Sequence, residues 1–266
     1  MATTFVSDNK NLLKIGWFTT GRGEGSYGLL ESTLNAIHSG ELHGKIAFVF
    51  VNRVEGQTNH TDRLLTLVRS HGIPLITLSS RDFRRAHNNK PWKNLREMFD
   101  KTIIELLKPY DADIAVHAGY MLIAPLLCSE YLTLNLHPAL PGGTIGMWQQ
   151  AVWDVIEKRL NRTGAMVHVS TINVDEGPVI ATSDFSVRGK NFDAHWEEID
   201  GFDLKKLKQK MGEELELFKA IRKAGLLRER PLLVETLKAV SQGRIDPTGS
   251  SGTIDLTKVV EKSVVN

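Results

Sequence analysis

Asn135, His137 and Asp175 are residues whose types and spacing could do chemistry. Asn135 and His137 stand two positions apart at the end of the apolar segment 133–136, so on a strand both side chains would lie on the same side. A histidine titrates near neutral pH and an asparagine amide donates hydrogen bonds, so the pair could polarise a carbonyl group. Asp175, in the acidic turn 173–177, could hold the imidazole charged. Taken singly, each residue also fits a structural role, as a loop cap, a half-buried histidine or a turn residue.

The glycine-rich segment 23–28, with the sequence GEGSYG, is a second candidate. It fits the pattern GxGxxG after a predicted strand and at the start of a predicted helix, where backbone N–H groups and the helix dipole favour an anion. A dinucleotide site also needs a group for the ribose at the end of the second strand, and Arg53 there could suit a 2′-phosphate. The segment therefore predicts phosphate binding or a turn that packs a helix closely, and a NADP-dependent reductase stays open.

Other polar and aromatic residues have simpler explanations. His168, in the predicted strand 165–172, could reach the same site and is expected to support it rather than to catalyse. Trp148 and Trp153 are expected in the core. A basic cluster is expected to be a solvated loop, although it could bind an anionic substrate. Its members are Arg81, Arg84, Arg85, His87 and Lys90.

Apolar periodicity predicts the elements that must position these residues. The alternation of strands and helices predicts a doubly wound α/β fold with a mostly parallel sheet, an antiparallel late pair and a C-terminal helical extension. Open sheets of this kind bind ligands at the carboxyl ends of their strands, where Asn135 and His137 stand. The predicted strands are 13–18, 46–51, 74–78, 113–117, 133–136, 165–172 and 178–187, and the predicted helices are 27–40, 62–71, 92–107, 148–156 and 231–240.

Composition excludes several classes of protein. Among 266 residues, 33 Lys and Arg against 31 Asp and Glu give a net charge of +2, which predicts no nucleic-acid partner. No apolar run approaches the roughly 20 residues that cross a bilayer, which predicts no membrane partner. A single cysteine, Cys128, excludes an intrachain disulfide framework and fits a cytoplasmic protein.

The order of these motifs resembles the formyltransferase family typified by phosphoribosylglycinamide formyltransferase. The shared landmarks are an amino-terminal glycine loop, the segment AGYM at 118–121, the Asn-x-His-Pro signature at 135–138 and the later aspartate turn. The resemblance runs from Lys14 to Val187 and resumes from Arg230 to Ile245. It implies a Rossmann-like formyltransferase fold and a place in one-carbon metabolism and purine biosynthesis.

The resemblance also implies an activity and a set of site residues. The implied reaction moves a formyl group from the co-substrate 10-formyltetrahydrofolate to an amine of a small, phosphorylated, glycinamide ribonucleotide-like substrate, and it requires no metal. Asn135, His137 and Asp175 take the catalytic roles. The residues implied for the substrate phosphate are Gly23, Gly25, Ser26 and Tyr27; those for folate are Tyr120, Met121, Leu122, Ile123, Ile172, Asn173, Val174 and Glu176; and those for the acceptor loop are Pro141, Gly142, Gly143 and Thr144.

The sequence departs from the family at three places near the substrate. Tyr27 stands at an asparagine position of the glycine loop, Leu122 replaces a frequent arginine, and the loop after His-Pro is shorter. Three alternatives stay open: a formyltetrahydrofolate hydrolase with water as acceptor, the NADP-dependent reductase, and a binding homologue without activity. The hydrolase members carry an amino-terminal regulatory domain, which we expect to be missing because the fold starts near Leu13.

These observations together predict the organisation of the chain. We expect a formyltransferase-like α/β catalytic domain over 1–187, a helical insertion over 188–229, a closing helix of the catalytic domain over 230–245 and a weakly ordered tail over 246–266. An apolar stripe within the insertion could form the surface of a homodimer.

Overall fold

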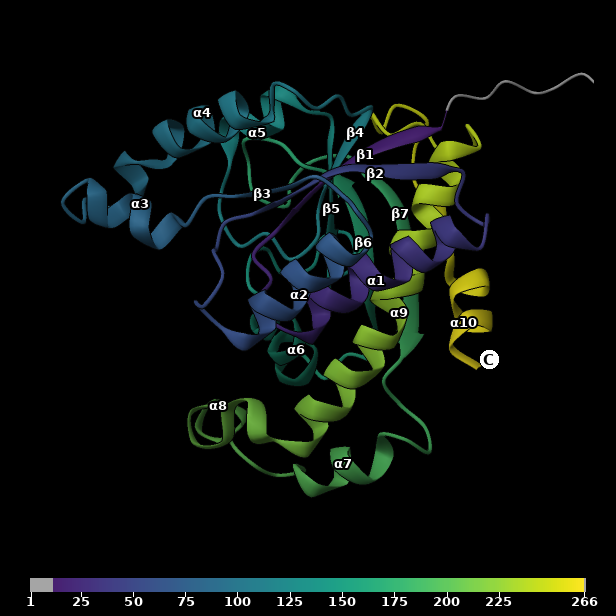
Figure 1. Cartoon of the computed structure of the whole chain (residues 1–266). Helices are drawn as coiled ribbons and strands as arrows, with labels where there is room; N and C mark the ends of the chain where they lie inside the picture. The colour runs from purple at the N-terminus through teal and green to yellow at the C-terminus, as the bar shows by residue number, and fades with distance from the viewer. Residues whose placement is uncertain (1–11, 266) are drawn as a thin grey trace, which may run out of the picture.

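The computed structural model describes residues 12–265, and an eight-stranded sheet runs through its centre (Figure 1). The strand order is β3-β2-β1-β4-β5-β6-β7-β8. The strands are β1 (Leu13–Thr19), β2 (Gly44–Val51), β3 (Leu75–Thr77), β4 (Ile114–His117), β5 (Thr133–His137), β6 (Arg162–Val169), β7 (Val179–Ser186) and β8 (Ile254–Asp255).

The connections between the strands are mostly helical. The helices are α1 (Glu24–His38), α2 (Asn59–Ser70), α3 (Ser80–Ala86), α4 (Arg96–Leu107), α5 (Pro125–Glu130), α6 (Trp148–Glu157), α7 (Asp193–Glu198), α8 (Leu204–Met211), α9 (Glu216–Ser241) and α10 (Thr257–Val265), with 3-10 turns at Trp92–Asn94 and Gly212–Glu214. None of the helices in the described part of the chain is long and apolar enough to span a membrane.

The predicted doubly wound, mostly parallel sheet is confirmed. Strands β1 to β5 pair in parallel, β6 pairs antiparallel with both β5 and β7, and β8 lies parallel to β7. The strands with continuous apolar runs are buried on both faces, as expected for a sheet covered by helices. The chain therefore has the antiparallel late pair that its sequence pattern predicts.

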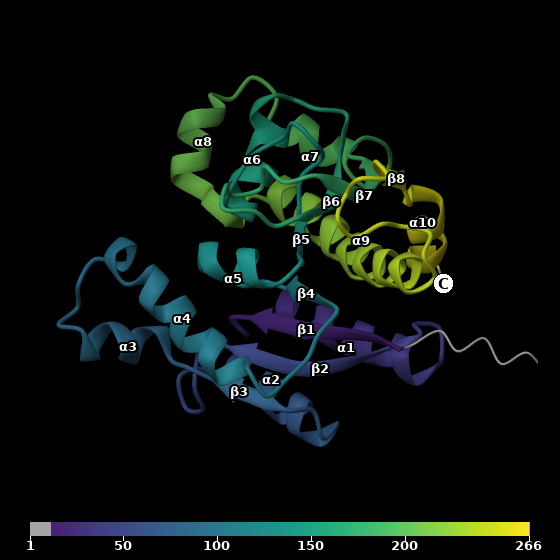
Figure 2. The same ribbon diagram turned by 90° about the horizontal axis from the view of Figure 1, so that it is seen from above.

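Side-chain alternation along the strands divides the interior into two cores, one on each face of the sheet. On β1, Ile15 and Trp17 face a core shared with α1, α2, α9 and α10, whereas Phe18 faces a core shared with α4 and α5. A third apolar cluster joins α6, α7 and the first half of α9. This cluster places α7 and α8 at the opposite end of the molecule from α3 and α4 (Figure 2).

Three predictions about the helices are wrong in detail. Helix α1 begins at Glu24, inside the glycine-rich segment, rather than at Tyr27. The basic cluster is a loop only in part, because Arg81, Arg84 and Arg85 lie in the helix α3, which Ser79 caps by accepting a hydrogen bond from the Asp82 N–H at 3.1 Å. The boundary predicted between 229 and 230 falls inside the single helix α9, which continues through Pro231.

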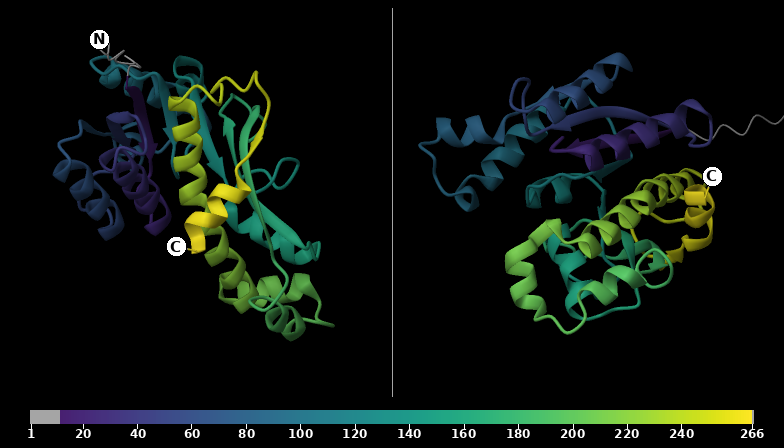
Figure 3. Two further views of the ribbon diagram at one scale, coloured as in Figure 1. Left: turned by 90° about the vertical axis from the view of Figure 1, so that its right-hand side faces the viewer. Right: turned by 90° about the horizontal axis from the view of Figure 1, so that it is seen from below.

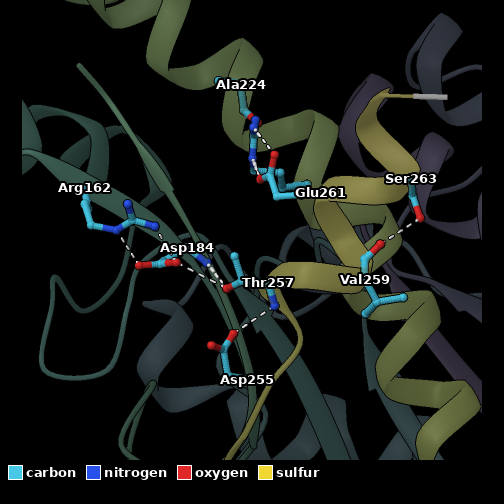
Figure 4. A network of polar contacts seen from close by, with 9 residues as sticks. Arg162, Asp184, Ala224, Asp255, Thr257, Val259, Glu261 and Ser263 are labelled. Carbon is cyan, nitrogen blue, oxygen red and sulfur yellow. Dashed lines mark hydrogen bonds and ion pairs between the residues drawn. The ribbon is translucent and has the colours of Figure 1, made fainter. Parts of the chain in front are cut away.

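The prediction of a weakly ordered tail is wrong for Ile254–Val265, which form β8 and α10. Leu256 and Val260 are buried in the main core, and α10 lies against α9 (Figure 3). Polar contacts hold the same segment: the Thr257 hydroxyl lies between the backbone and side chain of Asp184, and Glu261 accepts two hydrogen bonds from the guanidinium of Arg228 (Figure 4). The segment therefore belongs to the folded body of the protein.

Candidate active site

The candidate site lies where the direction of the strand order changes. Strands β1 and β4 are neighbours, and the helices that follow them cover opposite faces of the sheet, so the loops at their carboxyl ends mark the place where sheets of this kind bind ligands. Hydrogen bonds join the two loops: the Thr20 N–H donates to Gly119 O at 3.2 Å, and the Met121 N–H donates to Thr20 Oγ1 at 3.0 Å. The glycine loop and the segment 118–121 are therefore fixed side by side.

Asn135 and His137 project from the carboxyl end of β5 on the same face of the sheet, as predicted. Three neighbouring strands carry polar residues in register there, with His117 of β4 and His168 of β6 on either side of Asn135. Burial lowers the pKa of His117 to about 3, so this histidine is neutral at pH 7. The side chains of His137 and His168 are also almost completely buried.

Asp175 reaches this row from the turn between β6 and β7. Its φ of +56° lies in the left-handed region, which aspartate tolerates better than most residues. Two residues later the turn packs so closely on β6 that a Cβ at Gly177 would lie 1.8 Å from Val169 O. Only glycine fits at that position, and the close packing fixes the carboxylate of Asp175 over the end of β5.

The Asp175 carboxylate joins the other candidate residues into one network. Its Oδ1 lies 3.2 Å from Asn135 Nδ2 and 3.4 Å from His168 Nε2. Its Oδ2 lies 3.4 Å from His137 Nδ1 and accepts a hydrogen bond from the Gly146 N–H at 2.9 Å. Residues that are up to 40 positions apart in the sequence thus meet at one carboxylate.

The negative charge of Asp175 is stabilised although its side chain is buried. Burial alone would raise the pKa of this carboxyl, but the hydrogen bonds from His168 and from the Gly146 N–H, together with the nearby charge of His137, hold it below its ordinary value. Asp175 is therefore ionised at neutral pH and can balance a positive charge on His137.

His137 contacts an acceptor on each side of its ring. Its Nε2 lies 2.7 Å from Thr144 O, in the loop that follows the His-Pro pair, and its Nδ1 faces Asp175. Only the doubly protonated, cationic ring can donate to both oxygens. The Thr144 hydroxyl in turn donates to Asp154 Oδ2 at 2.6 Å, which ties the loop to α6. A substrate oxygen that is to receive the Nε2 proton must therefore replace Thr144 O.

Both ring nitrogens of His168 contact other residues of the network or the backbone. Its Nδ1 lies 3.0 Å from Val169 O, and its Nε2 lies 3.0 Å from Asn135 Nδ2. The Asn135 amide donates to Asp175 Oδ1 and lies beside His168 Nε2, so the amide must turn before Asn135 can donate to a substrate. The antiparallel register of β5 and β6 brings His168 here, in agreement with the expectation that His168 could reach the site.

The glycine-rich segment forms the first turn of α1, with Gly23 at the N-cap and no side chain bonded to the free N–H groups. Ser26 is buried, donates to Gly23 O at 2.9 Å and packs against Gly119. The ring of Tyr27 lies under the guanidinium of Arg63, at 3.9 Å. The backbone of this turn, rather than the hydroxyl of Ser26, can therefore meet an anion.

The residues implied for folate divide into two groups. Met121, Ile123, Ile172 and Val174 are apolar yet 41%, 41%, 66% and 39% exposed, and they belong to the two loops beside the network. Asn173 and Glu176 are exposed in the same aspartate turn. Tyr120 is buried in the aromatic core against Phe18, and Leu122 packs partly on that core. The exposed apolar side chains could contact a flat apolar ligand. The side chains of Tyr120 and Leu122 anchor the segment 118–123 to the core.

The loop predicted to border the acceptor also lies at the network. Pro141, Gly142 and Gly143 are exposed, and Thr144 is half-buried over His137. In the described part of the chain, no group of three or more His, Cys, Asp or Glu side chains is placed to hold a metal ion.

Comparison with known proteins agrees with this arrangement. A family model described as formyl transferase matches residues 19–194. A phosphoribosylglycinamide formyltransferase from Dictyostelium discoideum is 31% identical over 108 residues, which cover 36% of this chain and 52% of that protein. A formyltetrahydrofolate deformylase from Bacillus subtilis is 29% identical over 147 residues, which cover 53% of this chain and 41% of that protein. The chain thus spans about half the length of these relatives or less.

Solved structures show the same fold. A glycinamide ribonucleotide transformylase from Symbiobacterium toebii superposes with a TM-score of 0.64 at 21% identity, over 88% of this chain and 89% of that one.

Proposed function

The chain belongs to the formyl transferase family, and we propose that it moves a formyl group from 10-formyltetrahydrofolate to the amine of a small phosphorylated substrate similar to glycinamide ribonucleotide. The observation that carries the proposal is the network in which the Asp175 carboxylate contacts Asn135, His137 and His168. Such a network joins an imidazole, an amide donor and a carboxylate at one buried position, which suits acyl transfer to an amine.

Each residue of the network has a role in the proposed reaction. The amine nitrogen attacks the formyl carbon, and His137 and Asn135 donate hydrogen bonds to the carbonyl oxygen as it gains negative charge. Asp175 keeps His137 protonated and takes the amine proton, directly or through water. The tetrahedral intermediate then collapses, the bond from the formyl carbon to the folate nitrogen breaks, and that nitrogen leaves with the proton that Asp175 took from the amine, which restores the carboxylate.

The exposed apolar side chains beside the network support folate as the donor. Large apolar side chains rarely gather at a surface without a ligand or partner. Met121 and Ile123 come from one loop and Ile172 and Val174 from the other, so a flat ring between them would lie next to Asp175. Folate supplies such a ring together with an activated formyl group.

The free N–H groups at the first turn of α1 support a phosphorylated acceptor, since they are placed next to the segment 118–121 and have no side-chain cap. The curated relative from Dictyostelium carries the name of the enzyme of purine biosynthesis that formylates phosphoribosylglycinamide. We place the protein in the same pathway and in the cytoplasm, which its single cysteine supports.

Hydrolysis of the same donor is the second candidate, because the Bacillus relative is named formyltetrahydrofolate deformylase. Water would then attack the formyl carbon in place of the amine, with the same three residues in the same roles. Release of formate at the same rate with and without an amine would assign the protein to hydrolysis.

A calorimetric titration with a stable 10-formylfolate analogue tests the donor half of the proposal. We expect saturable binding to the wild-type protein and to Asp111→Asn, a matched control in which an exposed carboxylate paired with Lys14 is neutralised. Met121→Glu, which places a charge on the exposed apolar wall, should weaken binding at least about tenfold. Binding of NADPH with no binding of the folate would refute the proposal in favour of the reductase.

A further inference from the structure

Three arginines follow the carboxyl ends of three neighbouring strands. Arg22 follows β1, Arg53 follows β2 and Arg81 follows β3, and these strands are adjacent in the sheet. Backbone hydrogen bonds join their loops: the Asn52 N–H donates to the end of β1 at 3.4 Å, and the Ser80 N–H donates to Asn52 O at 3.1 Å. The three arginines therefore stand on one connected edge, next to the first turn of α1.

The carboxylates around this edge do not neutralise the cluster. Neither Arg22 nor Arg53 has a hydrogen bond or ion pair with another residue in the part of the chain described. Arg81 has only a distant contact, 3.6 Å from its Nε to Asp82 Oδ1. Two neighbouring acids are paired elsewhere, Glu24 with Arg63 at 2.5 Å and Glu55 with Arg69 at 2.9 Å, and Asp82 is shared, because its Oδ1 lies closer to Arg85, at 3.3 Å, than to Arg81.

The arginines also act on one another. Partial burial and the nearby charges of Arg22 and Arg81 lower the pKa of Arg53. Like charges held this close destabilise the folded protein, and an oxyanion between them would relieve the repulsion and accept several charge-assisted hydrogen bonds. Guanidinium groups are suited to this because their planar forks match the oxygens of a phosphoryl group.

We propose that Arg22, Arg53 and Arg81 form a binding site for a phosphoryl group, separate from the N-terminal turn of α1. The carboxyl ends of β5 and β2 are three strand spacings apart, roughly 14 Å. If the chain transfers formyl groups as proposed above, its acceptor carries a second anionic group at about that distance from the reacting amine. Such a substrate is longer than a simple phosphorylated sugar amide, and a nucleotide-linked amine has the required size and charge.

Titration of the full-length protein with inorganic phosphate and with pyrophosphate at low ionic strength tests the site. We expect saturable binding that Arg22→Gln and Arg53→Gln each weaken at least about tenfold, because each removes a charge-assisted contact. The matched control is Arg69→Gln, which removes the same charge from an arginine already paired with Glu55. No saturable binding, a stoichiometry and affinity that neither substitution changes, or equal weakening in Arg69→Gln would overturn the proposal.

A second titration distinguishes the two substrates that could supply an oxyanion. Folate analogues with one or several glutamate residues are compared on the wild-type protein and on Arg53→Gln. A loss of affinity only for the longer analogue, with phosphate binding unchanged, would overturn the phosphoryl assignment and give the site to the donor's carboxylates. Phosphate binding needs no turnover, so a protein that binds phosphate but transfers no formyl group would refute the proposed function and leave this site standing.

Discussion

Replacement of Asp175 by asparagine removes the charge at the centre of the network and replaces Oδ1, which accepts from Asn135 Nδ2, by an amide NH2 group. The amide has nearly the same shape, and its oxygen can still accept the hydrogen bond from the Gly146 N–H, which lies 2.9 Å from Asp175 Oδ2. The loop over His137 is therefore expected to stay in place, and the variant is expected to fold.

The loss of activity follows from the distance between the charges. Asp175 Oδ2 lies 3.4 Å from His137 Nδ1, and at an effective dielectric of about 20 two unit charges at that distance attract by about 5 kcal/mol. Water is almost excluded from both side chains, which are 4% and 7% exposed. Part of the attraction offsets the cost of burying the charges, so we expect kcat to fall about 10³-fold.

Steady-state formation of the formylated product measures this effect. Asp111→Asn neutralises an exposed aspartate and should keep kcat within about twofold of the wild type, since surface pairs contribute little. Circular dichroism and thermal unfolding show whether Asp175→Asn is folded. A folded Asp175→Asn variant with kcat within tenfold of the wild type would refute the assignment of the charge on Asp175 to the reaction.

Three further predictions concern stability and the supporting structure. Burial raises the pKa of Asp100 to about 6, so the contribution of this group to stability is fully present below its unfolded pKa and is lost as the pH rises through about 6; in urea unfolding, the stability of Asp100→Asn relative to wild type should rise by about 2 kcal/mol between pH 4 and pH 7, and an unchanged difference would contradict the burial argument. Gly177→Ala places a Cβ against Val169 O, so we expect the turn to shift and kcat to fall at least about tenfold, and full activity in kinetic assays would show that the turn does not fix Asp175. Leu256→Ala empties a buried position of the main core, and chemical denaturation should show a loss of about 2–3 kcal/mol, whereas a loss below 0.5 kcal/mol would mean that the C-terminal segment is not part of the fold.

The sequence pattern predicts the parts of the fold that depend on local periodicity. The apolar run before Thr19 and the glycines after it predict β1 and the turn into α1, because strand burial and positive φ leave direct marks on residue type. The segment Ile254–Val265 is mispredicted because glycine, serine and threonine residues dominate the composition of the tail in which it lies. Leu256 and Val260 hold this segment in place because they are buried in the main core, which is formed by residues far away in the sequence.

The candidate site also contains some residues that a local sequence pattern links and others that only the folded sheet brings together. Asn135 and His137 are linked by alternation on one strand, and the structure places Asp175 beside both. The position of His168 depends on the register of two antiparallel strands, and the contact of Thr144 with His137 depends on the path of a loop. Both are long-range features that no local pattern encodes, since they arise only when the sheet has formed.

The most direct test of the account follows the formyl carbon itself. The wild-type protein is mixed with a donor labelled with ¹³C in its formyl group and with glycinamide ribonucleotide or a nucleotide-linked amine, and mass spectrometry measures where the label goes. We predict that the label enters an N-formyl product with the wild type and with Asp111→Asn, and that it remains in the donor with His137→Ala. Label that is found only in formate, or that reaches the amine equally well with His137→Ala, would contradict the central claim.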